Sequence, residues 1–292
     1  MALSIWTDFA GLPIRQAFYD AKGIRTRVIE CGEGNPETLV FLHGTGGHAE
    51  AFSRNLRAHG AHLRVVSMDM IGHGYTDAPD IPYSMGTLVE HLGNLVDALG
   101  CKQVSVCGES LGAMVGAHYA IQHPDRVKKL VLNTGLLMRR DESDRKGLRD
   151  VLERTRKATG ELTRDTVRAR LNWLMYEPEK NVTEELIDIR YAIYSQPGRS
   201  RIIGRISQEI MGGLLDDAWV TQWSNENDLR KLRCPVLIMW SSHNPGLTED
   251  HAREAMKFIP DAQIHVLKNS AHWPQWEEPE EYNKVHLAFL RG

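Results

Sequence analysis

A serine between two glycines is the residue pattern with the clearest chemical meaning in this sequence. Gly108-Glu-Ser110-Leu-Gly112 lies between an apolar, strand-like run and a run with helical spacing, Leu111 to His123. Glycines at both ends allow the tight strand-to-helix turn that raises a serine hydroxyl above a sheet, with a helix N-terminus facing any anion formed there. A bare G-x-S-x-G also fits an ordinary glycine turn, but the strand and helix beside it favour Ser110 as a nucleophile.

A serine nucleophile needs a base, and one histidine stands where the chain order Ser, acid, His requires it. His272 follows the last strand-like run of the chain, residues 263–267. This position indicates a catalytic base, although most of the 13 histidines must be surface or core residues. His43, His73 and His91 lack that position and are predicted to be structural.

Stabilisation of an oxyanion is the third requirement, because a tetrahedral intermediate needs two waiting N–H donors. The glycine-rich segment from His43 to Gly47 follows the second strand-like run and offers a flexible backbone. The sequence predicts that the Thr45 and Leu111 amides form the oxyanion hole. Gly44 and Gly46 are expected to border the substrate.

The third triad position holds an amide where a carboxylate is expected. Asn244 follows the run at residues 235–240 and precedes His272 by 28 positions. An amide oxygen can hold the imidazole tautomer but brings no charge to balance imidazolium, and that loss can cost a serine enzyme about 10⁴ in rate. Glu249, Asp250 and Glu109 are the alternative carboxylates, and the first two also suit a helix N-terminus.

Elements that would position these residues alternate along the chain. Strand-like apolar runs occupy residues 26–31, 38–43, 63–68, 104–108, 129–133, 235–240 and 263–267, and helical spacing occupies 85–99, 111–123, 248–258 and 280–290. Continuous apolar runs between helices predict an α/β fold with a mostly parallel, doubly wound sheet. Strand signals vanish from about 138 to 232, which predicts a helical lid inserted between core segments 1–137 and 233–292. The many charges of residues 139–170 are interpreted as solvated helix faces.

Composition excludes several classes of function. Lys plus Arg number 35 against 38 Asp plus Glu, so the net charge of −3 argues against a nucleic-acid partner. Four scattered cysteines predict neither disulfides nor a zinc site. No run of about 18 apolar residues and no basic leader is seen, so a cytoplasmic protein without membrane contact is expected. We also expect no metal and no cofactor, since no such motif is present.

Taken together, these residues resemble the α/β-hydrolase superfamily along nearly the whole chain. Within it, the chain is most similar to the meta-cleavage product hydrolases, which cut a carbon–carbon bond in vinylogous diketone acids. The likeness lies in the tail, which reads His272-Trp273-Pro-Gln-Trp276-Glu277, then Tyr282-Asn283 and Leu287-Ala-Phe-Leu290, and in the segment from Val182 to Arg190. Two family asparagines are replaced, by Glu109 before the nucleophile and by Ala51 in the oxyanion loop, which also lacks the S-G-P-G-A form.

The resemblance implies a triad of Ser110, Asn244 and His272, with Arg190 and Trp273 touching the substrate. Trp173 would also shape the pocket, and Arg190 would supply one anion contact. The predicted activity is cofactor-free hydrolysis of a small, apolar substrate with one acidic group. A carboxylesterase or lactonase, a catalytically weak ligand-binding protein, and a cofactor-independent lyase or oxygenase remain as alternatives, and a homodimer is compatible with the sequence.

Overall fold

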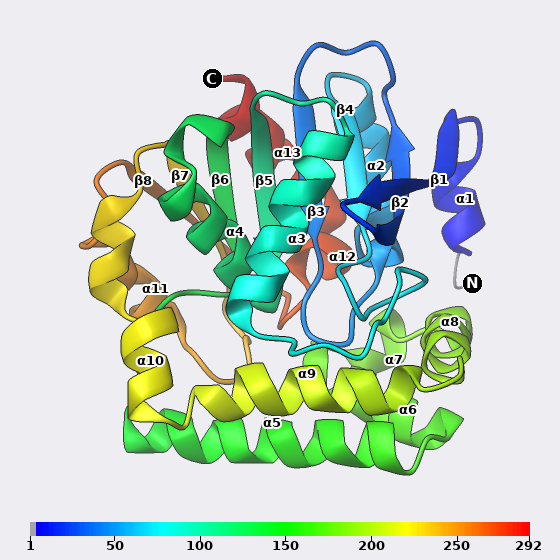
Figure 1. Ribbon diagram of the computed structural model, residues 1–292, viewed down its shortest axis with the longest axis vertical. Helices are drawn as coiled ribbons and strands as arrows, with labels where there is room; N and C mark the ends of the chain where they lie inside the picture. The colour runs from blue at the N-terminus through cyan, green and yellow to red at the C-terminus, as the bar shows by residue number, and fades with distance from the viewer. Residues whose placement is uncertain (1–3) are drawn as a thin grey trace.

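An eight-stranded sheet organises residues 4–292, which the computed structural model describes (Figure 1). The strands are β1 (Ile14–Ala21), β2 (Ile24–Cys31), β3 (Thr38–Leu42), β4 (Arg64–Met68), β5 (Val104–Glu109), β6 (Val127–Asn133), β7 (Val236–Ser241) and β8 (Ala262–Leu267), in the spatial order β1-β2-β4-β3-β5-β6-β7-β8. The β1–β2 and β2–β4 pairs are antiparallel, and the remaining pairs are parallel. The predicted mostly parallel sheet is confirmed.

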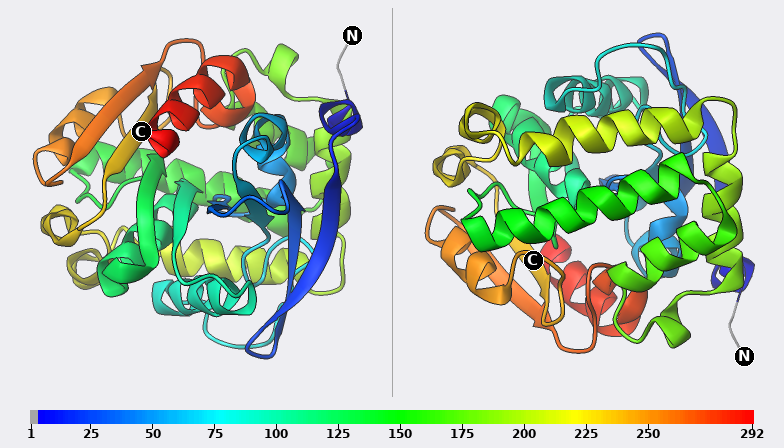
Figure 2. Two further views of the ribbon diagram at one scale, coloured as in Figure 1. Left: turned by 90° about the horizontal axis from the view of Figure 1, so that it is seen from above. Right: turned by 90° about the horizontal axis from the view of Figure 1, so that it is seen from below.

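Helices cover both faces of this sheet because successive strand residues point to opposite sides. Val40 and Leu42 of β3 pack with α3 (Met85–Ala98) and α4 (Leu111–Gln122), whereas Leu39 and Phe41 pack with α2 (Ser53–Gly60) and α13 (Pro279–Arg291). The other elements beside the sheet are α1 (Ile5–Phe9), α11 (Glu249–Met256), α12 (Pro274–Glu277) and the 3₁₀ turns Ala49–Phe52, Pro124–Arg126 and Glu226–Lys231. The doubly wound arrangement seen from above in Figure 2 therefore follows from apolar strands buried on both faces.

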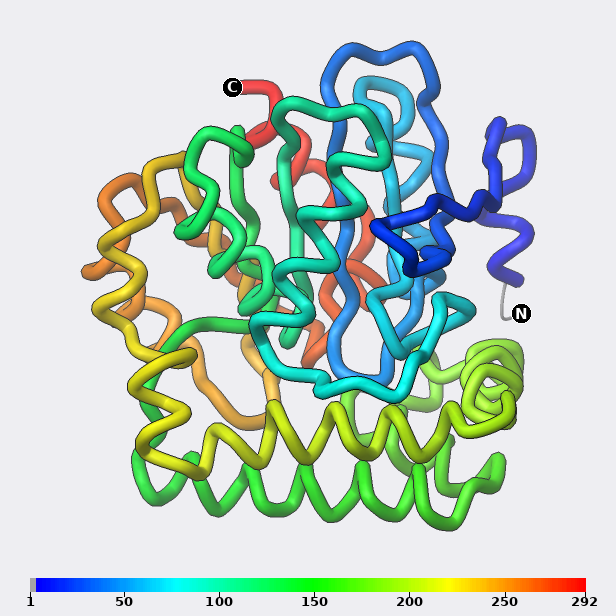
Figure 3. The backbone as a smooth tube through the Cα atoms, in the orientation of Figure 1, coloured from blue at the N-terminus to red at the C-terminus, as the bar shows by residue number. Residues whose placement is uncertain are grey.

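Between β6 and β7 the chain leaves the sheet and forms a run of helices before it returns (Figure 3). They are α5 (Glu142–Gly160), α6 (Arg164–Leu174), α7 (Pro178–Asn181), α8 (Glu184–Tyr194), α9 (Arg199–Gly213) and α10 (Asp217–Trp223). The long helices α5 and α9 lie side by side across one end of the sheet, as the view from below in Figure 2 shows. That end is the carboxyl edge, where β5 runs into Ser110.

Several core elements were not among the predicted ones, β1 and α2 among them. In β1, Arg15, Gln16 and other polar residues alternate with partly buried ones, because this antiparallel edge strand has one solvated face. Helix α2 is short and rich in charged and polar residues, so its apolar spacing is weak. No helix within residues 4–292 is both long enough and apolar enough to cross a membrane.

Candidate active site

Ser110 stands on a sharp turn between β5 and α4 that only this glycine pattern permits. Its φ is 54° and its ψ is −113°, a conformation that L-residues rarely adopt. A Cβ atom at Gly108 would lie 2.1 Å from the Gly112 carbonyl carbon, and one at Gly112 would lie 2.3 Å from the Leu42 oxygen. The two glycines therefore allow strand, turn and helix to approach closely enough to present the serine at the sheet edge.

His272 lies on the loop between β8 and α12, and hydrogen bonds on both sides fix that loop. The His272 amide donates to the Leu174 carbonyl over 2.9 Å, and the Thr134 hydroxyl donates to the His272 carbonyl over 2.9 Å. The Glu277 carboxylate accepts the amides of Ala271 at 3.1 Å and Trp273 at 3.0 Å. The imidazole is thus carried by backbone held at both neighbouring positions.

Asn244 occupies the position of the triad acid. His272 Nδ1 donates to Asn244 Oδ1 over 2.7 Å, and Asn244 Nδ2 donates to the Leu247 carbonyl over 2.8 Å. The second bond fixes which end of the amide faces the ring, so Nδ1 carries a hydrogen and Nε2 is an acceptor. Glu249 pairs with Arg253 at 2.6 Å instead of approaching His272, and Asp250 lies beside it in the first turn of α11.

Glu109, the residue before the serine, contacts the other ring nitrogen. Its Oε1 lies 3.2 Å from His272 Nε2, and its Oε2 accepts the Gly44 amide hydrogen over 2.5 Å. Ser110 Oγ has no hydrogen-bond partner within residues 4–292. Burial raises the pKa of Glu109 to about 8, and burial together with Arg170 lowers the pKa of His272 to about 3. Both groups are therefore neutral near pH 7.

A cavity of about 960 Å³, its mouth included, opens above Ser110 and His272. Its lining is polar near these residues and apolar toward the long helices α5 and α9. The apolar part comprises Met114, Leu136, Leu148, Val151, Met211, Leu214 and Leu247. A lining of this kind suits a small organic molecule with a few polar groups.

Three arginines line the cavity without an ion-pair partner among residues 4–292. Arg190 of α8 has two buried nitrogens, Nε and Nη2, with no hydrogen-bond partner in the described part of the chain, and Arg170 and Arg140 have one each. Arg190 lies over the Trp273 ring and Arg170 over the Trp173 ring, each with Cζ 5.1 Å from the ring centroid. Burial lowers the pKa of both Arg140 and Arg170 to about 10, so they remain cationic. These unpaired donors make the cavity attractive to an anion.

The interpretation of residues 139–170 as solvated charge was wrong for Arg140 and Arg170. The segment does carry exposed pairs, such as Arg156 with Glu153. Arg170, however, sits on the face of α6 turned to the cavity, and Arg140 precedes α5 at the same cavity. In a charged amphipathic segment, residue spacing does not distinguish an arginine that faces solvent from one that faces a cavity. Sequence reasoning therefore missed Arg140 and Arg170 as site residues.

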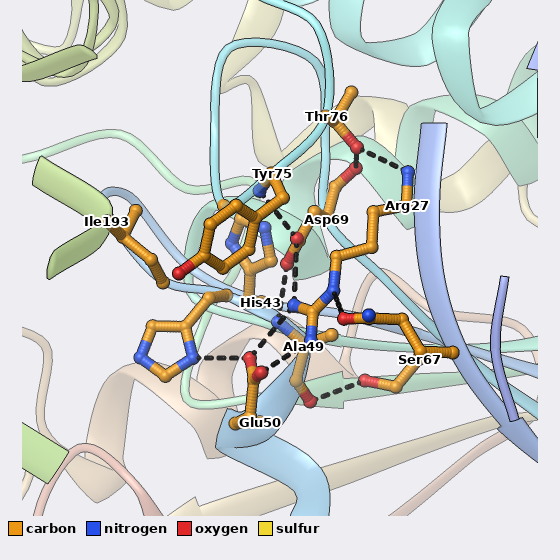
Figure 4. Close-up of polar contacts among 12 residues, drawn as sticks. Arg27, His43, Ala49, Glu50, Ser67, Asp69, Tyr75, Thr76 and Ile193 are labelled. Atoms are coloured by element: carbon orange, nitrogen blue, oxygen red, sulfur yellow. Dashed lines mark hydrogen bonds and ion pairs between the residues drawn. The ribbon is translucent and has the colours of Figure 1, made fainter. Parts of the chain in front are cut away.

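The loop after β3 is held from behind by a buried charge network (Figure 4). Arg27 of β2 pairs with Glu50 at 2.6 Å and with Asp69 at 3.1 Å. Asp69 also accepts the Ala49 amide over 2.7 Å, and Glu50 accepts from His48 over 2.9 Å. Figure 4 shows Arg27, Glu50 and Asp69 pointing toward one another, so the loop is anchored at Ala49 and Glu50.

Most of the sequence-predicted site residues lie around the one cavity. They are Gly44, Thr45, Ser110, Leu111, Trp173, Arg190, Asn244, His272 and Trp273. Gly46 was expected to border the substrate but contacts α8 and not the cavity. Its carbonyl accepts a hydrogen bond from the Tyr194 hydroxyl over 3.0 Å, and a Cβ atom at Gly46 would meet the same hydroxyl. In the oxyanion loop, the amide with an acidic partner is that of Gly44 and not that of Thr45.

The three histidines predicted to be structural lie in the interior. His43 Nε2 accepts the Met70 amide over 3.1 Å, and His91 Nδ1 accepts the Ile71 amide over 3.1 Å. His73 Nδ1 donates to the Ile71 carbonyl over 3.1 Å. Each is at most 3% exposed, and burial lowers the pKa of all three.

Comparison with known sequences gives consistent matches. A family model described as alpha/beta hydrolase fold matches residues 37–279. The chain is 27% identical over 281 residues to a 2-hydroxy-6-oxo-6-(2'-aminophenyl)hexa-2,4-dienoic acid hydrolase of Metapseudomonas resinovorans, covering 94% of this chain and 90% of the relative. It is 30% identical over 271 residues to a 2-hydroxy-6-oxononadienedioate/2-hydroxy-6-oxononatrienedioate hydrolase 2 of Pseudomonas putida, covering 90% of each.

Among solved structures, the chain is similar to the 2-hydroxy-6-oxo-6-phenylhexa-2,4-dienoate hydrolase of Rhodococcus sp. strain RHA1. The TM-score is 0.84 with 19% sequence identity, and the match covers 96% of this chain and 100% of that one. At this identity the likeness concerns the fold alone.

Proposed function

The chain belongs to the α/β-hydrolase fold family, and we propose that it is a cofactor-free hydrolase that cleaves a carbon–carbon bond in a vinylogous diketone acid. The observation that carries the proposal is one cavity lined by a serine on a strained turn, a histidine and an unpaired arginine. By their names, the relatives hydrolyse 2-hydroxy-6-oxo dienoic acids. Such a molecule offers a ketone to Ser110 and a carboxylate to Arg190.

In the proposed reaction Ser110, or a water molecule activated by His272, attacks the ketone carbon. Asn244 keeps the hydrogen of the imidazole on Nδ1, so that Nε2 is available as a base. The oxyanion would receive hydrogen bonds from the Thr45 amide in the loop and from the Leu111 amide at the start of α4, since the Gly44 amide already donates to Glu109. Preorganised amides of this kind stabilise the intermediate without reorganisation.

We propose that residues 138–232 act as a lid over a core formed by 1–137 and 233–292. The lid would supply Arg170, Trp173 and Arg190, and its helices α5 and α9 would supply the apolar half of the cavity. An apolar end and a cationic end suit a substrate with a hydrocarbon part and an acidic part. Arg190, partnerless and buried beside Trp273, is the proposed carboxylate contact.

The proposal is tested by assaying purified protein against a 2-hydroxy-6-oxo dienoate and a small carboxylic ester. We expect the dienoate to be consumed, Ser110→Ala to abolish turnover, and a serine-directed phosphonate to modify Ser110. Turnover of the ester without any cleavage of the dienoate would reject the carbon–carbon assignment and support an esterase.

A further inference from the structure

We propose that Glu109 is the general acid of this site: it holds the proton that His272 shares at rest and delivers it to the leaving group. The proposal rests on the proposed hydrolase function and divides between two residues the proton transfers that a serine triad usually assigns to histidine alone. It is drawn from the contacts of Glu109, which lies beside Ser110 in the chain and lines the same cavity.

Hydrogen-bond partners locate the shared proton. Because Asn244 Oδ1 accepts from His272 Nδ1, the ring presents a lone pair at Nε2. Glu109 Oε2 is already an acceptor, for the Gly44 amide at 2.5 Å. Because burial lowers the pKa of His272 to about 3 and so keeps the ring neutral near pH 7, the 3.2 Å contact between Glu109 Oε1 and His272 Nε2 calls for a hydrogen on Oε1. A Cβ at position 44 would lie 2.5 Å from Oε2, so the loop glycine and the acid fit one another.

The charges around Glu109 suit an acid that is neutral at rest and anionic during turnover. Arg170 of α6 and Arg190 of α8 act on it and favour its carboxylate form. Cys107 and Tyr282, also near it, contact each other at 3.2 Å, and burial raises the pKa of both, so they are neutral. Burial outweighs the two arginines, which gives Glu109 its raised pKa of about 8.

The step balances in protons and charge. The nucleophile hydroxyl gives its proton to His272 Nε2 as its oxygen bonds to the carbonyl carbon. The bond to the leaving carbon breaks, and that carbon keeps the electron pair and takes the Glu109 proton. Glu109 becomes a carboxylate and His272 an imidazolium, and the two charges face each other across the 3.2 Å contact. Glu109 thus supplies the counter-charge that Asn244 lacks, and return of the imidazolium proton to Glu109 restores the resting pair.

Glu109→Gln tests the role, because glutamine can accept from Gly44 and donate to His272 Nε2 but has no proton to give away. The variant is compared with the unaltered protein on the dienoate and on two esters of one acyl group, an ethyl ester and a 4-nitrophenyl ester. Nitrophenolate leaves without protonation, whereas ethoxide and a carbanion need an acid. We expect kcat/KM to fall by about 10² or more on the dienoate and ethyl ester and by less than about 10-fold on the nitrophenyl ester.

The pH profile gives an independent readout. With the ethyl ester, kcat/KM of the unaltered protein should fall above about pH 8, as Glu109 loses its proton, and this limb should be absent in Glu109→Gln. Glu209→Gln, on an exposed site of α9, is the matched control and should change nothing. Equal losses on both esters, no loss on either, or an unchanged alkaline limb would overturn the proposal. If no dienoate is cleaved, the proposed function fails, but the two esters still test Glu109.

Discussion

At the scale of single residues, the two nitrogens of His272 face chemically different partners. Nδ1 meets an uncharged amide at 2.7 Å and Nε2 meets an acid at 3.2 Å. The missing charge at Asn244 is testable with Asn244→Asp. A carboxylate beside Nδ1 favours imidazolium and should raise the pKa of His272 from about 3 by about one unit or more. The acid limb of kcat/KM against pH should move upward accordingly; an unchanged profile would mean that Asp at 244 does not bond the ring.

The cationic lining of the cavity makes a second prediction at this scale. Arg190→Ala should reduce kcat/KM for a carboxylated substrate by about 10-fold or more, the value of a charge-assisted hydrogen bond of about 1.5–3 kcal/mol. For the methyl ester of the same substrate, kcat/KM should fall much less. Arg156→Ala, on the exposed surface of α5, is the control. Steady-state kinetics on the acid and on its methyl ester test this prediction. Equal losses of kcat/KM on both substrates would show that Arg190 does not bind the carboxylate.

The motif and the chain order are sufficient to predict that Ser110, Asn244 and His272 lie around one cavity, because each follows a strand end at the same sheet edge. The contact between Glu109 and His272 cannot be predicted from the motif and the chain order. A residue inside a turn can direct its side chain into the site or away from it, and only the backbone conformation at Ser110 and the Gly44 amide decide this. Glu109 was one of three candidate carboxylates, and it proved to lie at the ring nitrogen opposite to Asn244.

At the scale of elements, the short helix α12 positions the loop that carries His272. Its Glu277 accepts three backbone amides, those of Ala271, Trp273 and Tyr176. Glu277→Ala leaves these buried donors unsatisfied, at about 1–3 kcal/mol for each group, and frees the loop. We expect a lower Tm and a kcat reduced by about 10²-fold, the effect of misplacing a catalytic group by about 1 Å. Glu280→Ala, an exposed carboxylate in α13, should alter neither quantity.

Strands buried on both faces were predicted well, because β3 through β7 read as continuous apolar runs that parallel strands require. Strand β1 was missed because its pairing with β2, and not its own composition, makes it a strand. The helices α5 to α10 were predicted only as one helical segment. Their positions over the sheet edge depend on tertiary contacts, such as those between α5 and α9, that no local pattern encodes.

At the scale of the whole molecule, burial of neutral histidines links folding to pH. His59 of α2 and His286 of α13 contact each other at 3.1 Å, and burial lowers the pKa of both. Burial likewise lowers His73 to a pKa of about 4 and His91 to about 3. The unfolded chain then binds more protons than the folded one below the ordinary histidine pKa of 6.5. The contribution of these histidines to stability should therefore be nearly constant above pH 7 and decline as pH falls from 6.5 toward 4.

His91 isolates this effect because it is interior, is not among the residues that line the cavity, and accepts the Ile71 amide. The pKa of His91 is 6.5 in the unfolded chain and about 3 in the folded protein. Its protonation on unfolding should therefore lower the free energy of unfolding by about 2 kcal/mol between pH 7 and pH 5. His91→Gln removes the titrating group while keeping an acceptor, so its free energy of unfolding should drop less over that interval by this amount. Denaturant unfolding at both pH values measures the difference, with exposed His62→Gln as control. If His91→Gln and the unaltered protein lose equal stability on acidification, His91 is not held neutral by the fold.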